Sequence, residues 1–377
     1  MSLIKRVFGT PASKQNFITI RLARKIYYPG EVVSGSILFS VAEAQKFDEF
    51  YVQFMGIEET SIQVNKSESV YINGKSWTKN YTMTYHESIL YFKTKIRLLD
   101  HKCTFAPGEY IFPFNFQLPS NIPGSFTTKN IIGNRSPVGI VKYQVKTKAK
   151  SSGMLISDLT QACEFTVTER LYRNINTSQV SQDTHVTILC CFPRGKVNVV
   201  AFMDKDAYVP GEIAQLRLFL DTTQSRVKHS SIKVHLRQAV YITAEGHPSK
   251  VAKVLCTTKT FGVSANEKVE RYLEFPIPKN CSVSIKSRLI ACQHEILVEL
   301  PVSWSPNVVI KQPVCLYRAT GHAEGIFFCK AAPCVGAVHP PMNEPPAYCE
   351  YYSDRDNTLN EGEGADNISL SPTASGF

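Results

Sequence analysis

Several features that mark membrane-spanning or secreted chains are missing from this sequence. It has no run of about 18 or more apolar residues, so we expect no membrane-spanning helix. The opening stretch MSLIKRVFGT holds a basic pair, but no apolar segment follows it, so we expect no secretory signal. Position 2 is serine, which excludes the simple N-myristoylation pattern. These absences predict a chain that stays in the cytoplasm.

Signatures of common enzyme and metal sites are also missing. The sequence has no glycine-rich phosphate loop, no GxSxG and no CxxC pair. Cys315, Cys329, Cys334 and His339 are spaced too widely for a typical structural zinc site. The 11 cysteines are scattered, odd in number and not preceded by a secretory signal, so we expect reduced thiols. We therefore predict no enzymatic activity, no cofactor and no bound metal.

The net charge of +10 is unevenly distributed along the chain. From Asn343 onward, seven acidic residues stand against one basic residue, Arg355, which gives −6. The first 342 residues hold the remaining 41 basic and 25 acidic residues, which gives +16. Such a basic body suits anionic surfaces such as lipid headgroups or phosphorylated peptides, although ordinary solubilising charge has the same signature. No nucleic-acid-binding motif accompanies the charge, so we expect no nucleic-acid partner.

Apolar residues alternate at period two in many short segments. In residues 110–118 every second side chain is aromatic or leucine, and in residues 141–149 polar side chains, mostly lysine, occupy the alternate positions. This pattern is typical of half-buried antiparallel strands. Cys292 and His294 fall in the inward register of another such segment, which favours core packing over a nucleophile and its base. Helical periodicity is nearly absent, with at most a short candidate at residues 47–50, so we predict an all-β fold.

One turn-and-strand pattern occurs twice. YYPGEVVSGSILFS, residues 27–40, returns as YVPGEIAQLRLFLD at residues 208–221. In each copy the proline fixes φ at the first turn position, the glycine allows a positive φ at the next, and a strand follows. Two matching copies predict two β-sandwiches in tandem.

Composition sets the expected domain boundaries. We expect the first sandwich at residues 14–172 and the second at residues 194–312. Between them, residues 173–193 include RNINTSQVSQDTH, which is polar and poor in strand signals, as a linker should be. Residues 313–377 lose the alternation and become rich in Pro, then in Ser, Asn, Gly and Glu. They are therefore predicted as a flexible, disordered tail.

Four segments together resemble the arrestin clan, and within it the α-arrestins, or arrestin domain-containing proteins. The segments are YYPGE with YVPGE, PGEYIFPFNFQLPSNIPGSF at 107–126, GIVKYQVKTKAK at 139–150, and LCCF at 189–192. The resemblance implies two immunoglobulin-like β-sandwiches of roughly seven or eight strands each, joined by a short hinge. It also implies a cytosolic adaptor that links membrane proteins to sorting machinery. Arg24 and Lys25 lie only a few residues before Pro29, unlike the early basic pair of visual and β-arrestins, so a phosphate-sensing role is not carried over to them.

The tail contains a PPxY motif, Pro345-Pro346-Ala347-Tyr348. Consecutive prolines favour a polyproline II helix, which presents Pro345, Pro346 and Tyr348 to the aromatic-lined groove of a WW domain. Ala347 is expected to face away from that groove. In α-arrestins, tail motifs of this kind recruit HECT-type ubiquitin ligases through their WW domains. HPPMN at residues 339–343 lacks the tyrosine, so we count one motif.

These observations predict a non-enzymatic adaptor that links membrane-protein cargo to a WW-domain HECT-type ubiquitin ligase, for ubiquitination, endocytosis and endosomal sorting. The expected partners are the ligase, the cytoplasmic parts of membrane receptors or transporters, and an anionic membrane surface. We expect a cytoplasmic protein that is recruited to the plasma membrane and endosomes. Two alternatives stay open: an arrestin-like scaffold that binds phosphorylated receptors without a ligase, and a retromer-like structural subunit.

Two surface features have more than one interpretation. Cys190 and Cys191 are either a palmitoylation site or two thiols at the start of a strand, one of them buried. Lys142, Lys146 and Lys148 form a positive stripe that either contacts lipid headgroups or phosphorylated cargo, or is simply solvated.

Overall fold

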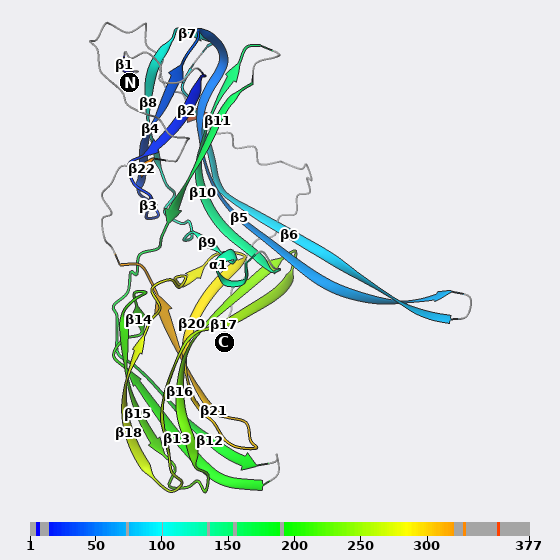
Figure 1. Ribbon diagram of the computed structural model, residues 1–377, viewed down its shortest axis with the longest axis vertical. Helices are drawn as coiled ribbons and strands as arrows, with labels where there is room; N and C mark the ends of the chain where they lie inside the picture. Colours follow the sequence, from blue (N-terminus) through cyan, green and yellow to red (C-terminus); the bar gives the residue numbers. More distant parts are fainter. Residues whose placement is uncertain are drawn as a thin grey trace, which may run out of the picture.

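The structure is a computed structural model in which two β-sandwiches follow one another along the long axis of the molecule (Figure 1). The structure describes residues 5–7, 15–72, 75–99, 101–133, 136–153, 157–188, 192–319, 327–328 and 353–354. Nearly all regular structure in these residues is strand, so the predicted all-β class with two tandem sandwiches is confirmed.

The first sandwich packs a five-stranded sheet against an eight-stranded one. The five-stranded sheet has the order β1 (Lys5–Val7), β8 (Gly108–Gln117), β4 (Val32–Val41), β2 (Phe17–Leu22) and β22 (Phe327–Phe328). The eight-stranded sheet has the order β23 (Ser353–Asp354), β6 (Lys75–Arg97), β5 (Gln45–Ile72), β10 (Val138–Ser151), β11 (Leu159–Val167) and β3 (Ile26–Tyr27), with β7 (Cys103–Phe105) beside β5 and β9 (Phe126–Thr127) beside β10. A single helical turn, α1 (Lys129–Ile132), follows β9.

The second sandwich packs a four-stranded sheet against a six-stranded one. The four-stranded sheet has the order β12 (Ser178–Ile188), β13 (Phe192–Met203), β15 (Ile213–Asp221) and β18 (Lys268–Pro276). The six-stranded sheet has the order β14 (Ala207–Tyr208), β21 (Val308–Leu316), β20 (Ile290–Leu300), β16 (His229–Ala244) and β17 (His247–Val263), with β19 (Ile285–Lys286) beside β20.

Period-two alternation builds the cores, as the sequence predicts. Every second residue from 141 to 149 of β10 is buried, and the lysines between them are partly exposed. In the first sandwich, Phe39 of β4 is fully buried, with its ring centre 5.3 Å from those of both Phe47 and Phe50 on β5. Burial of each such ring contributes roughly 1.5–3 kcal/mol, so these aromatic contacts hold the two sheets together.

The helical candidate at residues 47–50 is wrong, because Phe47 and Phe50 both lie in β5. Their spacing of three residues is normally helical. Here the ladder with β10 shifts register between Lys150 and Ser151, and the extra β5 residue lets both rings face the core.

The expectation of a strand-poor linker is also wrong, because β12 occupies most of it. β12 is an edge strand that pairs with β13 alone, and half of its described side chains are exposed. Such a strand is stabilised by its backbone hydrogen bonds to the neighbouring strand rather than by side-chain burial. Its sequence therefore shows little apolar alternation. Val186 is the buried exception.

The last strand of the second sandwich extends beyond the predicted boundary at residue 312. β21 runs to Leu316, which is fully buried, and Pro313 lies within it opposite Glu295 of β20. The described strand on the other side of β21 pairs only with Cys315 and Leu316, so Pro313 sits on an open edge where a missing N–H is tolerated. Most of the predicted tail lies outside the described residues.

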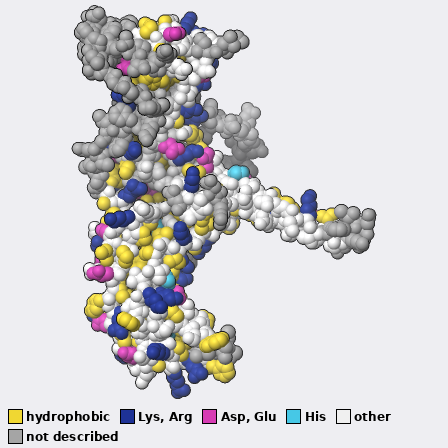
Figure 2. Space-filling view, in the orientation of Figure 1, with side chains coloured by type: hydrophobic (Ala, Val, Ile, Leu, Met, Phe, Trp, Pro, Cys, Tyr) yellow, Lys and Arg dark blue, Asp and Glu magenta, His cyan; other side chains and the backbone are white. Residues whose placement is uncertain are grey.

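A long hairpin of β5 and β6 stands out from the body as an arm (Figure 1). β10 accompanies β5 only as far as Ser61, so beyond that point the arm is a two-stranded ribbon. Figure 2 shows few charged side chains along it. None of the described residues forms a helix long and apolar enough to cross a membrane.

Among the described residues, the expectation of reduced thiols fails at Cys163 of β11, which is disulfide-bonded. Cys256, Cys281, Cys292 and Cys315 are free thiols.

Candidate functional site

The residues predicted to bind a WW domain, Pro345, Pro346 and Tyr348, lie outside the described residues. The same holds for Cys190 and Cys191, and for three members of the rejected zinc group, Cys329, Cys334 and His339. Within the described ranges, no group of three or more His, Cys, Asp and Glu side chains could hold a metal ion. The candidate site is therefore described for the two sandwiches, beginning with their repeated turn.

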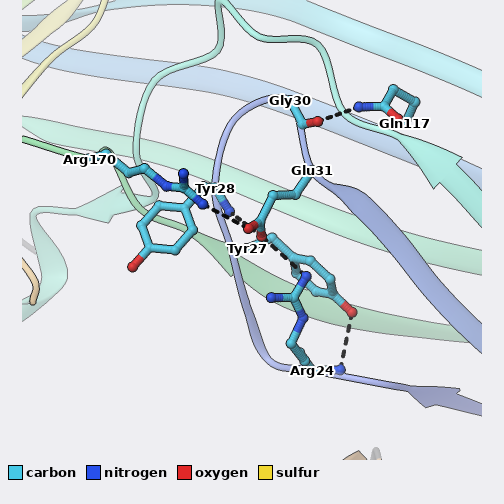
Figure 3. Close-up of polar contacts among 7 residues, drawn as sticks. All are labelled: Arg24, Tyr27, Tyr28, Gly30, Glu31, Gln117 and Arg170. Atoms are coloured by element: carbon cyan, nitrogen blue, oxygen red, sulfur yellow. Dashed lines mark hydrogen bonds and ion pairs between the residues drawn. The ribbon is translucent and has the colours of Figure 1, made fainter. Parts of the chain in front are cut away.

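The first copy of the turn is organised by Glu31 (Figure 3). Its Oε2 accepts a hydrogen bond from the backbone N–H of Tyr28 at 3.0 Å and lies 3.2 Å from Nη2 of Arg24. The backbone N–H of Arg24 donates to the hydroxyl of Tyr27 at 3.2 Å. Gly30 has φ of +79°, a conformation that glycine adopts without strain.

The second copy repeats these contacts 181 residues later. Oε2 of Glu212 accepts from the backbone N–H of Val209 at 2.9 Å, and Oε1 lies 3.5 Å from Nζ of Lys205. The backbone N–H of Lys205 donates to the hydroxyl of Tyr208 at 3.2 Å, and Gly211 has φ of +100°. The predicted equivalence of the two copies therefore holds at the level of individual hydrogen bonds.

Each turn ties the start of its sandwich to the end of the same sandwich. Tyr27 pairs in parallel with Val167 at the end of β11, and Tyr208 pairs in parallel with Leu316 at the end of β21. Both tyrosines are fully buried. The repeated turn therefore has a structural role, and we call each copy a clasp: Tyr27 to Glu31 is the first and Tyr208 to Glu212 the second. The contacts that the two copies share are explained without a ligand.

The first clasp has an additional cation from the segment that leaves its sandwich. Nη2 of Arg170 lies 3.1 Å from Oε1 of Glu31, and its guanidinium lies 4.3 Å from the ring centre of Tyr28 (Figure 3). On the other side of the turn, the side-chain amide of Gln117 donates to the carbonyl of Gly30. Arg170 therefore anchors the connection between the sandwiches to the first clasp.

A buried carboxylate joins the two sandwiches. Glu58 of β5 is completely buried, and its Oε2 accepts from the hydroxyl of Tyr91 at 2.5 Å. Its Oε1 accepts from the hydroxyl of Ser287 at 2.5 Å and from the backbone N–H of Leu289 at 3.0 Å, both in the second sandwich. Burial raises the pKa of Tyr91, and its hydrogen bond to Glu58 raises it further, so this phenol stays protonated as a donor. We call this set of four residues the Glu58 bridge.

Apolar packing surrounds the Glu58 bridge. Val240 and Ile242 of β16, with Leu289 and Ile290, are buried in the core cluster of the first sandwich although they belong to the second. The remainder of the second sandwich has its own core cluster. The two cores are therefore distinct but meet through apolar side chains, and a carboxyl group buried among them depends strongly on its hydrogen bonds.

The base of the arm also contacts the second sandwich. The backbone N–H of His86 donates to Glu245 at 3.0 Å, and the backbone N–H of Glu245 donates to Glu87 at 2.7 Å. The ring of Tyr85 stacks on that of His247, with centres 3.6 Å apart. These contacts fix the direction in which the arm leaves the body.

A cleft of about 550 Å³ opens beside the Glu58 bridge, lined by residues of both sandwiches. Its cations are Arg170, Lys286 and Arg288, and its one acid is Glu169. Lys286 and Arg288 are exposed and form no ion pair with another described residue, whereas Arg170 is offset by Glu31. Burial raises the pKa of Glu169, and a hydrogen bond from the Gly124 N–H opposes this. The cleft is chemically suited to a carboxylate or phosphate group.

Cys292 and His294 pack in the core, as the alternation predicts. Burial lowers the pKa of His294 to about 4 and raises the pKa of Cys292 to about 12, so both are neutral near pH 7. Nδ1 of His294 lies 2.9 Å from the hydroxyl of Ser284, and the amide of Gln238 donates to the Cys292 sulfur at 3.2 Å. A thiol with a raised pKa is a poor nucleophile, which agrees with a structural role.

The lysine stripe of β10 is largely neutralised. Nζ of Lys142 lies 2.7 Å from Glu59, and Nζ of Lys148 lies 2.8 Å from Asp158. Lys146 lies between them and is partly exposed. The stripe therefore presents less positive charge than its sequence indicates.

The sequence analysis missed Glu58, although a signal was present. Residues Val52, Phe54, Thr60 and Ile62 alternate inward along β5, and Glu58 falls in the same register. An acidic residue at an inward position marks a buried polar network.

Comparison with known proteins places this body in a family. The model of the arrestin (or S-antigen) N-terminal domain matches residues 18–174, and that of the C-terminal domain matches residues 193–319. The chain is 21% identical over 313 residues to arrestin domain-containing protein A of Dictyostelium discoideum, covering 82% of this chain and 52% of that protein. It is 26% identical over 232 residues to arrestin domain-containing protein 1 of Rattus norvegicus, covering 60% of this chain and 47% of that protein. The chain thus spans about half the length of these curated relatives. Since the two domain matches cover most of its length, the chain belongs to the arrestin family and is similar to its arrestin domain-containing members.

Proposed function

We propose that this protein is a non-enzymatic adaptor that holds a WW-domain HECT-type ubiquitin ligase beside a membrane-protein cargo. Membership of the arrestin family implies an adaptor in trafficking or signalling. The observation that carries the ligase assignment is the sequence Pro345-Pro346-Ala347-Tyr348, which follows the last strand of the second sandwich by about 30 residues. In sequence the motif lies between β22 and β23, the two short strands that pair with the first sandwich.

The proline pair supports the assignment because it lowers the conformational entropy that the segment loses on binding. A polyproline II segment is already extended before it binds, so little chain entropy is lost in a WW groove. Pro345 and Pro346 would stack on the groove aromatics, and Tyr348 would enter the neighbouring pocket. No catalytic group is required for this role.

The body would supply the cargo contact. The Glu58 bridge and the arm-base contacts hold the two sandwiches in one arrangement. The cleft beside the bridge carries two exposed cations, Lys286 and Arg288, with no ion pair to a described residue, and they suit acidic groups on the cytoplasmic part of a receptor or transporter. Recruitment to the plasma membrane and endosomes would follow from the cargo and from anionic lipids. Holding ligase and cargo on one chain raises their effective concentration, which favours ubiquitin transfer.

Replacing Tyr348 with alanine is expected to abolish binding of a WW domain to the full chain. The change removes the ring that would fill the second pocket and leaves the two prolines in place. Recovery of a HECT-ligase WW domain on the immobilised protein measures the effect. Tyr351→Ala is the matched control, because it removes a tyrosine three residues away and outside the motif. Equal recovery by wild type, Tyr348→Ala and Tyr351→Ala would exclude the motif as the ligase site.

One other function has a specific observation in its favour. The cations of the interdomain cleft also suit a phosphorylated receptor segment, as in an arrestin-like scaffold that acts without a ligase. Under that function, cargo binding requires phosphate and weakens steeply with salt, while Tyr348 has no influence.

A further inference from the structure

One long strand of the second sandwich has an open edge. β17 (His247–Val263) pairs with β16 along its 17 residues and is the terminal strand of the six-stranded sheet, so no described strand pairs with its other edge. At about 3.3 Å per residue this edge is roughly 55 Å long. An open edge displays unpaired N–H and C=O groups, which form a template for another strand.

The charges on β17 all have one sign. Lys250, Lys253 and Lys259 are its only charged residues other than His247, and all three are exposed. None forms an ion pair with another described residue. One strand further in, the basic residues are neutralised, because Lys233 and Arg237 of β16 are paired with Glu299 and Glu295 of β20. Three lysines without an ion pair to a described residue therefore lie along this open edge.

Apolar side chains accompany the lysines. Val254 is 48% exposed and Phe261 is 87% exposed. The register with β16 puts Lys250, Val254, Lys259 and Phe261 on one face of the sheet. Figure 1 shows β17 directly below the base of the arm, and Figure 2 shows Lys and Arg side chains over the second sandwich. An exposed phenylalanine on a long open edge is a liability unless a partner covers it at times.

We propose that β17 is a docking edge for an acidic, extended peptide segment, which adds to the six-stranded sheet as a further strand. Backbone hydrogen bonds along the edge supply affinity for any extended chain, and the side chains of β17 select among sequences. Carboxylates opposite Lys250 and Lys259, which share one face of the sheet, form favourable cross-strand pairs. A second copy of β17 is disfavoured as the occupant, because its lysines would face these lysines. The proposal rests on the proposed function in one respect: the acidic segment is assigned to the cytoplasmic part of the cargo.

The test uses the full-length protein and a synthetic peptide of about 12 residues in which glutamate alternates with valine and threonine, a length that spans most of the edge. We expect it to bind and to slow hydrogen exchange of backbone amides in β17. The matched peptide has the same charge but carries two prolines in its centre, which remove ladder donors and break the strand. It is expected to bind at least about tenfold more weakly and to leave β17 unprotected.

Charge reversal on the edge provides the second arm of the test. The double change Lys250→Glu with Lys259→Glu is expected to weaken binding of the strand-forming peptide by about tenfold or more. Lys279→Glu, an exposed lysine in the loop after β18, is the control and is expected to change little. β12, the open edge of the other sheet, carries Asp183 and no lysine, so its amides should gain no protection.

Three results would overturn the proposal: no binding, equal binding of both peptides, or protection spread over the body instead of β17. In each case the lysines serve only to protect the edge from unwanted pairing. The WW-domain experiment with Tyr348→Ala is independent of these results. If the peptide does not bind β17 but Tyr348→Ala still abolishes WW-domain binding, the docking edge is wrong and the adaptor function is unaffected. If the peptide binds β17 but Tyr348→Ala has no effect, the ligase assignment is wrong and the docking edge is unaffected.

Discussion

Glu58→Ala is expected to lower the free energy of unfolding by about 3 kcal/mol and to separate the unfolding of the two sandwiches. The change removes one acceptor from three donors: the partly buried hydroxyls of Tyr91 and Ser287, of which Ser287 also contacts the carbonyl of Ile290, and the buried backbone N–H of Leu289. Two of these donors belong to the second sandwich, so the loss falls on the contact between domains. Glu58 itself is completely buried among apolar side chains of both sandwiches, whereas Tyr91 and Ser287 also line the cleft.

Denaturant unfolding followed by fluorescence and by circular dichroism measures this effect. The wild type should show transitions that coincide, whereas Glu58→Ala should show two that do not. Glu59→Ala is a closely matched control, since the neighbouring carboxylate is 42% exposed and pairs with Lys142 at the surface. Surface pairs of this kind contribute about 0–1 kcal/mol. Similar losses for Glu58→Ala and Glu59→Ala would contradict the Glu58 bridge.

Acidification is expected to destabilise the protein by up to about 3 kcal/mol through His294, between about pH 6.5 and pH 4. Burial holds the pKa of His294 at about 4 in the folded chain, below its ordinary value of 6.5. The unfolded chain therefore binds this proton first as the pH falls, and stability is lost from about pH 6.5 downward until the folded form also protonates near pH 4. The imidazole is only 3% exposed, so solvent does not screen the cost.

Unfolding of His294→Gln at pH 7 and pH 4.5 isolates this contribution. Glutamine keeps a polar group near Ser284 but cannot take up a proton. The variant is expected to lose less stability between the two pH values than the wild type does. His185→Gln removes an exposed histidine and should leave the acid sensitivity unchanged. An identical loss in wild type and His294→Gln would contradict a buried neutral imidazole.

Much of the fold could be predicted because the burial of a strand residue in a sandwich follows from its neighbours in the sequence. The inward positions of β8 and β10 follow from alternation alone, and the equivalence of Glu31 and Glu212 follows from the repeated turn. In both cases the interacting residues lie within a few positions of one another, so a short window of sequence contains the whole pattern.

The junction between the sandwiches could not be predicted because its partners lie far apart in the chain. Glu58 and Ser287 are separated by 229 residues, and nothing near either residue specifies the other. β12 was missed because an edge strand needs little apolar alternation, and the end of β21 was misplaced because the alternation fades after Pro313, before the strand ends at Leu316. In each case tertiary pairing overrides the local signal.

Proximity labelling around the intact protein and around a variant lacking residues 345–348 tests the adaptor account most directly. The account predicts that membrane proteins are labelled by both forms, because the body is unchanged, and that HECT-type ligases are labelled by the intact form alone. Equal labelling of ligases by both forms would contradict the claim that this short proline segment brings the ligase to the cargo.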